Sequence, residues 1–415
     1  MKFGIKTIDD FDVKSKTVLM RIDINEPVDK GNDRLKDITR IEGCAPTVKE
    51  LSGKGAKLVL LAHQGSDIEY GSYYTLRPHA KVLSELTGLD IEFVPDVCGP
   101  YAQEKIMALQ DGEVLLLDNV RFMAEEMTLF ETKLNLTPEQ QARTQVVQKL
   151  YPLADLFILD AFAAAHRAQP TLIGFEELLP SAMGRLFEKE YGVLAEILEQ
   201  PKKPMVFVLG GAKIQDAFLM METALRDNIA DKVLAGGLVA NVLLIAKGVD
   251  IGQPSQEFIR KNNLEACIEQ SKPLLEKYAE KIVLPVDLAY AGAGRVNVDV
   301  TQLPVEQLFL DIGEKTANIF REEILKAKTV FVNGPMGVFE KEPTEYGTKE
   351  VWRALGETKA FTVLGGGDSI SATNKYKLAD QIGYICTGGG AMVRFLSGEE
   401  LPAVKALKRA AQRFA

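Results

Sequence analysis

The sequence predicts an α/β protein whose parallel sheets are covered by helices on both faces. Short, apolar, β-branched segments alternate along the chain with segments whose apolar residues recur about once per helical turn. Glycine-rich turns often separate the two kinds of segment. At 415 residues the chain is too long for one ordinary hydrophobic core, so two domains are expected.

The strands expected in the first half of the chain are residues 17–24, 57–62, 91–94, 114–117 and 156–159. Those expected in the second half are residues 205–209, 232–235, 281–285, 308–312, 329–332, 361–364 and 383–386. Helices are expected between the strands, for example over residues 78–86 and 217–228, because their apolar residues lie about one turn apart.

The domains are expected to divide near residues 185–200. LFEKEYGVLAEILEQ (186–200) has the spacing of an amphipathic helix, and PKKP (201–204) ends it before the next strand. We therefore predict one domain over residues 1–185 and a second over residues 186–400, with the helix as connector. Residues 132–148 are polar and are expected to be a surface connection, with a helix starting at Thr137-Pro138-Glu139.

Composition limits the classes of partner. The net charge of −9 argues against nucleic acid or an acidic membrane surface. No apolar run approaches the ~20 residues of a membrane span, and the N-terminus lacks the apolar segment of a signal peptide, so a cytoplasmic protein is expected. The four cysteines lie far apart without a CxxC pair, so reduced thiols are expected rather than a zinc site or disulfides.

Glycine clusters follow several strands of the second half and precede helices. They are Gly210-Gly211, Gly236-Gly237, Gly365-Gly366-Gly367 and Gly388-Gly389-Gly390. A single cluster often makes only a tight turn. Their recurrence favours a polyphosphate site, because bare backbone N–H groups and helix N-termini attract phosphate. The chain contains neither GxxxxGK[ST] nor GxGxxG, so it is neither a P-loop protein nor one with the dinucleotide fingerprint.

Three side chains could complete this site. Lys213 lies just past its glycines and could reach phosphate as a point charge. The carboxylate of Asp368 suits a magnesium ion carried by a nucleotide, and the hydroxyl of Ser369 suits phosphate or a metal-bound water. An ordinary helix N-cap is the alternative for Asp368 and Ser369.

Arginines mark the strand ends of the first half. Each of them lies at or soon after an expected strand, and acids, an amide and histidines accompany them: Arg21, Arg40, Arg121 and Arg167, with Asp23, Asn25, His63 and His166. One arginine alone more often makes a surface salt bridge. Several at the carboxyl ends of parallel strands favour a site for a small anion, because guanidinium groups bind carboxylate and phosphate bidentately.

His63 and His166 could act as general bases or as neutral, hydrogen-bonded orienting groups. A carboxylate acceptor is already ionised at neutral pH and needs no base. The orienting role is therefore favoured.

The chain resembles the phosphoglycerate kinase family nearly from end to end. The matching segments are RIDINEP (21–27), ITRI (38–41), LAHQG (61–65), LLLDNVRF (115–122), LDAFAAAHRAQPT (159–171), VLGGAKIQD (208–216), LDIGEKT (310–316), VNGPMGVFE (332–340), VLGGGDS (363–369) and CTGGGA (386–391). The AHRAQP and GGLVAN forms are similar to the archaeal branch.

The resemblance implies two doubly wound, Rossmann-like domains joined by a helical hinge. Residues 1–185 would bind 3-phosphoglycerate, residues 186–400 would bind nucleotide, and residues 401–415 would fold back onto the first domain. The implied reaction is reversible phosphoryl transfer between 1,3-bisphosphoglycerate and ADP in glycolysis and gluconeogenesis. The partners would be 3-phosphoglycerate and MgATP, with Mg²⁺ carried by the nucleotide. The resemblance leaves monomer and homodimer open.

The resemblance also implies site residues. Phosphoglycerate would be held by Asp23, Asn25, Arg40, His63, Arg121 and Arg167, with Arg21 supporting. Arg40 would neutralise the moving phosphoryl group together with Lys213. Nucleotide would lie along Gly210, Gly211, Ala212, Lys213, Gly236, Asn333, Pro335, Glu340, Gly366, Gly367, Asp368 and Ser369. Glu340 would accept hydrogen bonds from ribose, and Asp368 would face magnesium.

Some positions depart from the family pattern. Ser66 replaces a common arginine, for which Arg77 is a candidate substitute, and Ala217 replaces a common lysine. Ala163-Ala164, Gln169 and Phe309 replace Gly-Thr, histidine and glycine. Archaeal-type members share several of these changes.

Two other functions fit parts of the sequence. A dinucleotide oxidoreductase would explain doubly wound sheets, but the GxGxxG fingerprint is missing and glycine turns are in surplus. A non-catalytic nucleotide sensor derived from the kinase would explain Ser66 and Ala217.

Overall fold

The computed structural model describes residues 1–65 and 70–415. The chain forms two compact units. The first comprises Met1–Val193 and Glu400–Ala415, and the second comprises Leu194–Glu399. Ser66, at which the sequence departs from the family pattern, lies outside the described residues.

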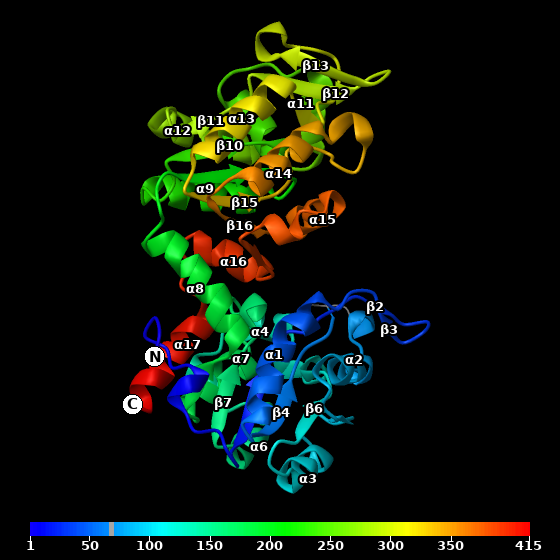
Figure 1. Cartoon of the computed structure of the whole chain (residues 1–415), viewed down its shortest axis with the longest axis vertical. Coiled ribbons are helices and arrows are strands. Elements are labelled where there is room, and N and C mark those ends of the chain that lie inside the picture. Colours follow the sequence, from blue (N-terminus) through cyan, green and yellow to red (C-terminus); the bar gives the residue numbers. More distant parts are fainter. Residues whose placement is uncertain (66–69) are drawn as a thin grey trace. The chain divides into compact units, whose positions relative to one another are not determined.

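The first unit is built on a parallel sheet in the order β5-β6-β4-β1-β7-β8 (Figure 1). The strands are β1 (Thr17–Arg21), β4 (Lys57–Leu61), β5 (Ile91–Val94), β6 (Val114–Leu117), β7 (Leu156–Leu159) and β8 (Ser181–Met183). The chain starts at β1, builds one side of the sheet and then returns to β7, so the strand order reverses between β1 and β7. Ligands bind at such a reversal in doubly wound folds.

Helices join these strands. They are α1 (Thr39–Gly53), α2 (Arg77–Thr87), α3 (Pro100–Ala108), α4 (Thr128–Leu134), α5 (Pro138–Gln141), α6 (Gln145–Leu150) and α7 (Pro170–Ile173). A small hairpin of β2 (Val28–Asp29) and β3 (Arg34–Leu35) lies between β1 and α1. Side chains of β1 and β4 are almost all buried, as expected of strands covered on both faces. α5 begins after Thr137, where the sequence predicted a helix start, and Thr137 and Gln140 form a capping box there.

The C-terminal helix α17 (Pro402–Arg413) packs in the first unit against α7, β8 and the 3₁₀ turn η7 (Phe175–Glu177). In the first turn of α17, the N–H of Ala403 donates a hydrogen bond of 3.2 Å to the carbonyl of Ala165. Glu177 is buried and lies 3.1 Å from Nε of Arg409 and 2.6 Å from Nη1 of Arg413. Ion pairs to a buried carboxylate and buried apolar residues therefore both hold α17.

The second unit repeats the plan with a parallel sheet in the order β11-β10-β9-β15-β16-β17. The strands are β9 (Met205–Leu209), β10 (Lys232–Ala235), β11 (Ile282–Val283), β15 (Thr329–Asn333), β16 (Phe361–Gly365) and β17 (Tyr384–Cys386). The helices are α9 (Ile214–Arg226), α10 (Gly237–Ala246), α11 (Gln253–Lys261), α12 (Glu265–Tyr278), α13 (Glu314–Lys326), α14 (Tyr346–Glu357), α15 (Gly367–Tyr376) and α16 (Gly389–Leu396). The strand order reverses between β9 and β15.

One part of the second unit was not expected. Residues 308–312 were predicted as a strand of the alternating pattern, but only β14 (Asp311–Ile312) forms, and it pairs antiparallel with β12 (Asp287–Ala291). β12 also pairs antiparallel with β13 (Arg295–Asp299), giving a separate three-stranded sheet. β12 and β13 alternate small or polar residues with apolar ones on a partly solvated surface, so no apolar run marks them.

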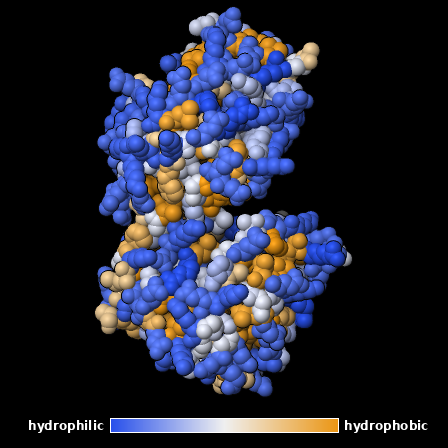
Figure 2. Space-filling view, viewed as in Figure 1, coloured by the Kyte–Doolittle hydropathy of each residue, from blue (hydrophilic) through white to orange (hydrophobic). Residues whose placement is uncertain are grey.

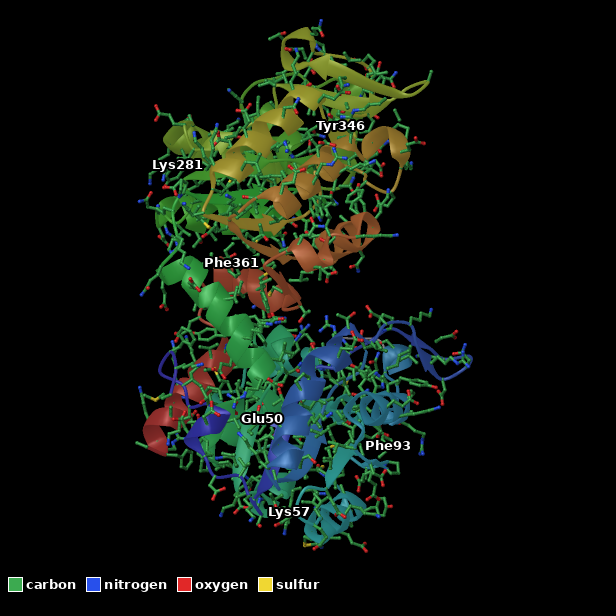
Figure 3. All side chains as sticks on the ribbon, viewed as in Figure 1. Glu50, Lys57, Phe93, Lys281, Tyr346 and Phe361 are labelled. Atoms are coloured by element: carbon green, nitrogen blue, oxygen red, sulfur yellow. The ribbon has the colours of Figure 1, made fainter. Side chains whose placement is uncertain are left out.

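The chain passes from the first unit to the second within α8 (Arg185–Glu199). Arg185 fixes the beginning of α8 through two ion pairs. Its Nη2 lies 2.7 Å from a carboxylate oxygen of Glu50, which extends from α1 (Figure 3), and its Nη1 lies 2.9 Å from a carboxylate oxygen of Asp9. Phe187 and Tyr191 are buried on the same helix. The first turns of α8 are therefore firmly part of the first unit.

Hydrophilic side chains cover most of the face seen in Figure 2, and hydrophobic residues form small separate groups between them. Among residues 1–65 and 70–415, no helix combines the length and apolar character that crossing a bilayer requires.

Candidate active site

Arg21 closes β1 at the point where the first sheet reverses its order. The side chain is fully buried. Its Nε donates to Oγ1 of Thr171 at 3.0 Å, Nη1 donates to the carbonyl of Ile22 at 2.5 Å, and Nη2 donates to Nδ1 of His63 at 3.1 Å. Arg21 therefore cannot face solvent, and its geometry is that of a residue that orients His63.

His63 follows β4 and is buried beside this guanidinium. Burial lowers the pKa of His63 well below its usual range, and the positive charges of Arg21, Arg121, Arg40 and Arg167 lower it further. Because an arginine can only donate, Nδ1 accepts and the proton is on Nε2. The structure thus places His63 in the neutral, hydrogen-bonded state that the sequence favoured over a general base.

The four predicted arginines lie near one another, since the positive charge of each of them lowers the pKa of the same imidazole, that of His63. Arg121 lies in the 3₁₀ turn η3 (Val120–Phe122) after β6 and is buried. Arg167 follows β7 and the turn η6 (Phe162–Ala164), and its Nη1 donates to Oγ1 of Thr128 at 2.8 Å. Such a concentration of positive charge is suited to a small anion.

Arg40 is placed differently from the sequence expectation. It lies in the first turn of α1, beyond the β2–β3 hairpin, rather than directly after a strand. Its Nη1 forms an ion pair with Asp23, and its side chain keeps 34% exposure against 6% for that of Asp23. The N–H of Asn25 donates to Asp23 at 3.1 Å, and Oδ1 of Asn25 accepts from the N–H of Gly65 at 3.0 Å.

Glu126, which lies behind these groups, carried no sequence signal. Glu126 is fully buried, and both the N–H and Oγ1 of Thr171 donate to its carboxylate, at 2.7 and 3.0 Å. Burial raises the pKa of Glu126 to about 7, against the opposing charge of Arg21. A continuous chain of hydrogen bonds thus runs from Glu126 through Thr171 and Arg21 to His63.

Two cavities occupy the corresponding place in the second unit. The first is mainly apolar and measures about 230 Å³. It is lined by Gly211, Ala212, Gly237, Leu238, Asn241, Phe258, Leu288, Leu308, Phe309, Leu310, Asp311, Ile312, Pro335, Gly337, Val338, Phe339, Glu340 and Asp368. Of these, Phe258 of α11 and Leu288 of β12 were not foreseen, because they belong to segments without a recognisable motif. Mostly apolar walls with few polar groups are typical of a site for a flat ring system.

The second cavity is polar and measures about 130 Å³. It is lined by Gly210, Gly211, Ala212, Lys213, Asp216, Asn333, Gly334, Gly366, Gly367, Asp368, Ser369, Gly389, Gly390, Met392 and Val393. Ala212, Gly211 and Asp368 belong to both linings. An apolar cavity joined to a glycine-lined polar one fits the base and the phosphates of a nucleotide.

The glycines serve two purposes. A Cβ on Gly210 would lie 2.2 Å from the carbonyl oxygen of Pro335, and one on Gly334 would lie 2.2 Å from that of Gly210, so these two allow the loops after β9 and β15 to touch. Gly236 lines neither cavity, and a Cβ there would strike Met336. A Cβ on Gly367 would have no atom within 4 Å, and the φ of this residue is ordinary. The surrounding residues therefore do not require glycine at this position.

Lys213 and Asp368 are exposed at the polar cavity. Lys213 stands at the N-cap position of α9, and no ion pair or hydrogen bond of its side chain exists within the described ranges. The N-cap reading of Asp368 and Ser369 is wrong, because Gly366 occupies the N-cap of α15 without a side-chain hydrogen bond. Ser369 is buried instead, and its Oγ accepts from the N–H of Gly334 at 2.8 Å.

The comparisons with known proteins agree with this arrangement. The family model described as phosphoglycerate kinase matches residues 8–399. The chain belongs to the phosphoglycerate kinase family. Relatives of that name from Methanothermus fervidus and Thermococcus kodakarensis are each 42% identical, over 99% and 98% of this chain and 98% of each relative. These archaeal relatives agree with the archaeal character of the motifs.

Solved phosphoglycerate kinases have the same fold. The Pyrococcus horikoshii enzyme superposes with a TM-score of 0.87 at 40% identity, covering 99% of this chain and all of that one. The Coxiella burnetii enzyme gives a TM-score of 0.83 at 29% identity over 98% of this chain. The two parallel-sheet domains expected from the sequence are thereby confirmed, as is membership of a family of glycolytic kinases.

The structure also locates departures from the phosphoglycerate kinase pattern. Ala217 is buried in α9, so its side chain packs against neighbours. Phe309 is buried in the wall of the apolar cavity, with its ring centroid 6.0 Å from that of Tyr290. Arg77, the proposed substitute for the arginine absent at Ser66, has its guanidinium 4.7 Å from the centre of the Phe93 ring on β5 (Figure 3).

Proposed function

We propose that the chain catalyses reversible phosphoryl transfer between 1,3-bisphosphoglycerate and ADP, giving 3-phosphoglycerate and ATP. The observation that carries the proposal is the set of four arginines around one neutral histidine in the first unit. Such a site accepts a small polyanion, whereas the paired cavities of the second unit suit a nucleotide. The first unit (Met1–Val193 with Glu400–Ala415) would form the 3-phosphoglycerate domain, and the second unit (Leu194–Glu399) would form the nucleotide domain.

The phosphoglycerate would contact the charged and polar groups that gather near the carboxyl ends of the strands of the first unit. We assign this role to Asp23, Asn25, Arg40, His63, Arg121 and Arg167. Arg21 would act indirectly, because it is buried and holds Nδ1 of His63. The Nε2–H of His63 would remain a donor for a substrate oxygen.

The nucleotide would place its base in the apolar cavity and its phosphates in the polar one. Gly210, Gly211, Ala212, Gly366, Gly367 and Asn333 would approach the phosphates, Pro335 and Glu340 would face base and ribose, and Gly236 and Ser369 would hold the loops in place. Within the described ranges, no group of three or more His, Cys, Asp or Glu side chains could hold a metal ion by itself. One exposed carboxylate, Asp368, suits Mg²⁺, which keeps several waters and binds through substrate phosphates and one or two carboxylates.

Catalysis would consist of positioning and charge neutralisation. The acceptor carboxylate is ionised at neutral pH, so no side chain has to remove a proton. Arg40 and Lys213 would supply positive charge to the in-line transfer, and bound Mg²⁺ would neutralise phosphate charge. Bending along α8 would close the units around both substrates and exclude water, which would otherwise hydrolyse the acyl phosphate.

We further propose a cytoplasmic enzyme whose partners are small molecules rather than nucleic acid. The acidic composition and the glycolytic family support this.

A coupled assay for 1,3-bisphosphoglycerate tests the proposed reaction. Product should form from 3-phosphoglycerate and ATP, should require Mg²⁺, and should vanish when the acceptor is omitted. Tight ATP binding without any product would overturn the proposal in favour of a nucleotide sensor.

A further inference from the structure

Arg40 is held by two carboxylates that act on different parts of it. Asp23 pairs with its guanidinium. Oε1 of Glu26 accepts a hydrogen bond of 2.6 Å from its backbone N–H. The side chain and the main chain of this one residue are therefore fixed separately.

Glu26 reaches this position from the loop after β1. It is 3% exposed, and α1 has no side-chain cap from its own N-cap residue, Ile38. A free N–H in the first helical turn favours an anion, so a carboxylate from another segment takes the capping role there. The pKa of Glu26 is nevertheless raised, because burial outweighs the hydrogen bond from Arg40.

A buried amide clamps the backbone of Glu26. Oε1 of Gln64 accepts from the N–H of Glu26 at 3.1 Å, and Nε2 of Gln64 donates to its carbonyl at 2.8 Å. His79, which is fully buried, lies with Nε2 3.0 Å from the same Oε1. Since that oxygen only accepts, Nε2 of His79 carries a proton and donates.

The clamp is joined to the other anion-binding segments. Asn119 and Gln64 exchange two hydrogen bonds, of 3.0 and 2.8 Å, and Oδ1 of Asn119 also accepts from the N–H of Arg121 at 3.0 Å. One buried network thus sets the backbone of two arginines that come from α1 and from the turn after β6.

We propose that Glu26 is a positioning residue for phosphoryl transfer, which sets the place of Arg40 by holding its backbone N–H. The proposal rests on the proposed function, because it presumes that Arg40 serves the transferred group. Arg40 would stabilise the transition state more than the ground state, so loss of Glu26 lowers kcat more than it changes KM. A displacement of ~1 Å of such a group costs about 100-fold in rate.

The test compares variants at both carboxylates of the α1 N-terminus. Glu26→Ala and Glu26→Met remove the acceptor, and Glu26→Gln keeps it. Asp37→Ala is the matched control, because Asp37 is exposed and accepts from the N–H groups of Ile38 and Thr39 but not of Arg40. Circular dichroism and thermal unfolding report on the fold, and the coupled assay reports kcat and both KM values.

We expect kcat to fall about 10- to 100-fold in Glu26→Ala and Glu26→Met, while KM for MgATP is unchanged. Glu26→Gln and Asp37→Ala should keep most of the wild-type kcat. In an Arg40→Ala background, adding Glu26→Ala should have no further effect on kcat, because the residue through which it acts is gone.

Wild-type kcat in a folded Glu26→Ala or Glu26→Met variant overturns the proposal. A further loss of equal size in the Arg40→Ala background also overturns it, because Glu26 would then be acting on something else. Failure of the wild-type chain to form any product counts against the proposed function instead.

Discussion

The carboxylate of Asp160 accepts a hydrogen bond of 3.0 Å from the backbone N–H of Phe187, which links the end of β7 to the first turn of α8. Asp160 is fully buried, and a Cβ on Gly184 would collide with its carboxylate. This acid thus anchors the helix through which the chain passes between its two units.

Burial raises the pKa of Asp160 to about 7, against 3.8 for an ordinary aspartate. Between these values the folded chain binds a proton that the unfolded chain lacks, so the contribution to stability is present at low pH and is lost as pH rises through about 7. Asp160→Asn removes this dependence and keeps an acceptor for Phe187. From about pH 5 to about pH 8, the wild type should lose roughly 3 kcal/mol of unfolding free energy relative to the variant. Denaturant unfolding at both pH values measures the difference, and parallel curves would contradict it.

The imidazoles of His63 and His79 should be neutral at neutral pH. Burial and neighbouring arginines lower the pKa of His63 well below 6.5, and burial lowers that of His79 to about 4. With three histidines in the chain, NMR titration can follow each one after assignment by substitution. The signal of His79 should not move between about pH 8 and pH 5.5, since its folded pKa of about 4 lies below that range, and His63 should titrate only well below pH 6.5. A midpoint near 6.5 for His63 would show that its imidazole is not held as described.

Lys213→Ala should lower kcat about 10²- to 10³-fold without affecting the fold, since the side chain is exposed at the polar cavity and no interaction within the described ranges depends on it. Lys247→Ala is the control, because Lys247 is an exposed lysine at the end of α10 that lines neither nucleotide cavity. Coupled-assay kcat and melting temperature are the readouts. Equal kcat values in the two variants would show that Lys213 does not contribute to phosphoryl transfer.

Gly367→Ala should leave the melting temperature close to that of the wild type, since no atom lies within 4 Å of the added Cβ. The methyl group would instead occupy space that we assign to phosphate, so KM for MgATP should rise. Gly294→Ala provides the comparison, because Gly294 has equally open surroundings but lies in the β12–β13 turn. If KM for MgATP stays unchanged in Gly367→Ala, phosphate does not approach this backbone.

Local patterns decided much of the fold. β5, β6, β7, β9 and β10 begin and end where apolar, β-branched runs predicted, and the glycine clusters do separate β9, β10, β16 and β17 from the helices that follow. Periodicity and turn chemistry depend on neighbouring residues, so a single sequence expresses them directly. Strand order and the antiparallel sheet of β12, β13 and β14 depend on which segments meet, and no local pattern encoded them.

The sequence by itself determined the residue types of the anion site and the turns of the nucleotide site. Only the tertiary structure decided which of these residues face a ligand and which support other residues. It buried Arg21 against Thr171, 150 positions away, and attached Glu26 to Arg40 across the hairpin. It also placed Ser369 where its hydroxyl supports the loop at Gly334 instead of capping a helix, and it left free space around Gly367. Burial and hydrogen-bond partners arise from contacts between distant segments, and these set whether a charged or polar side chain faces a ligand or serves another residue.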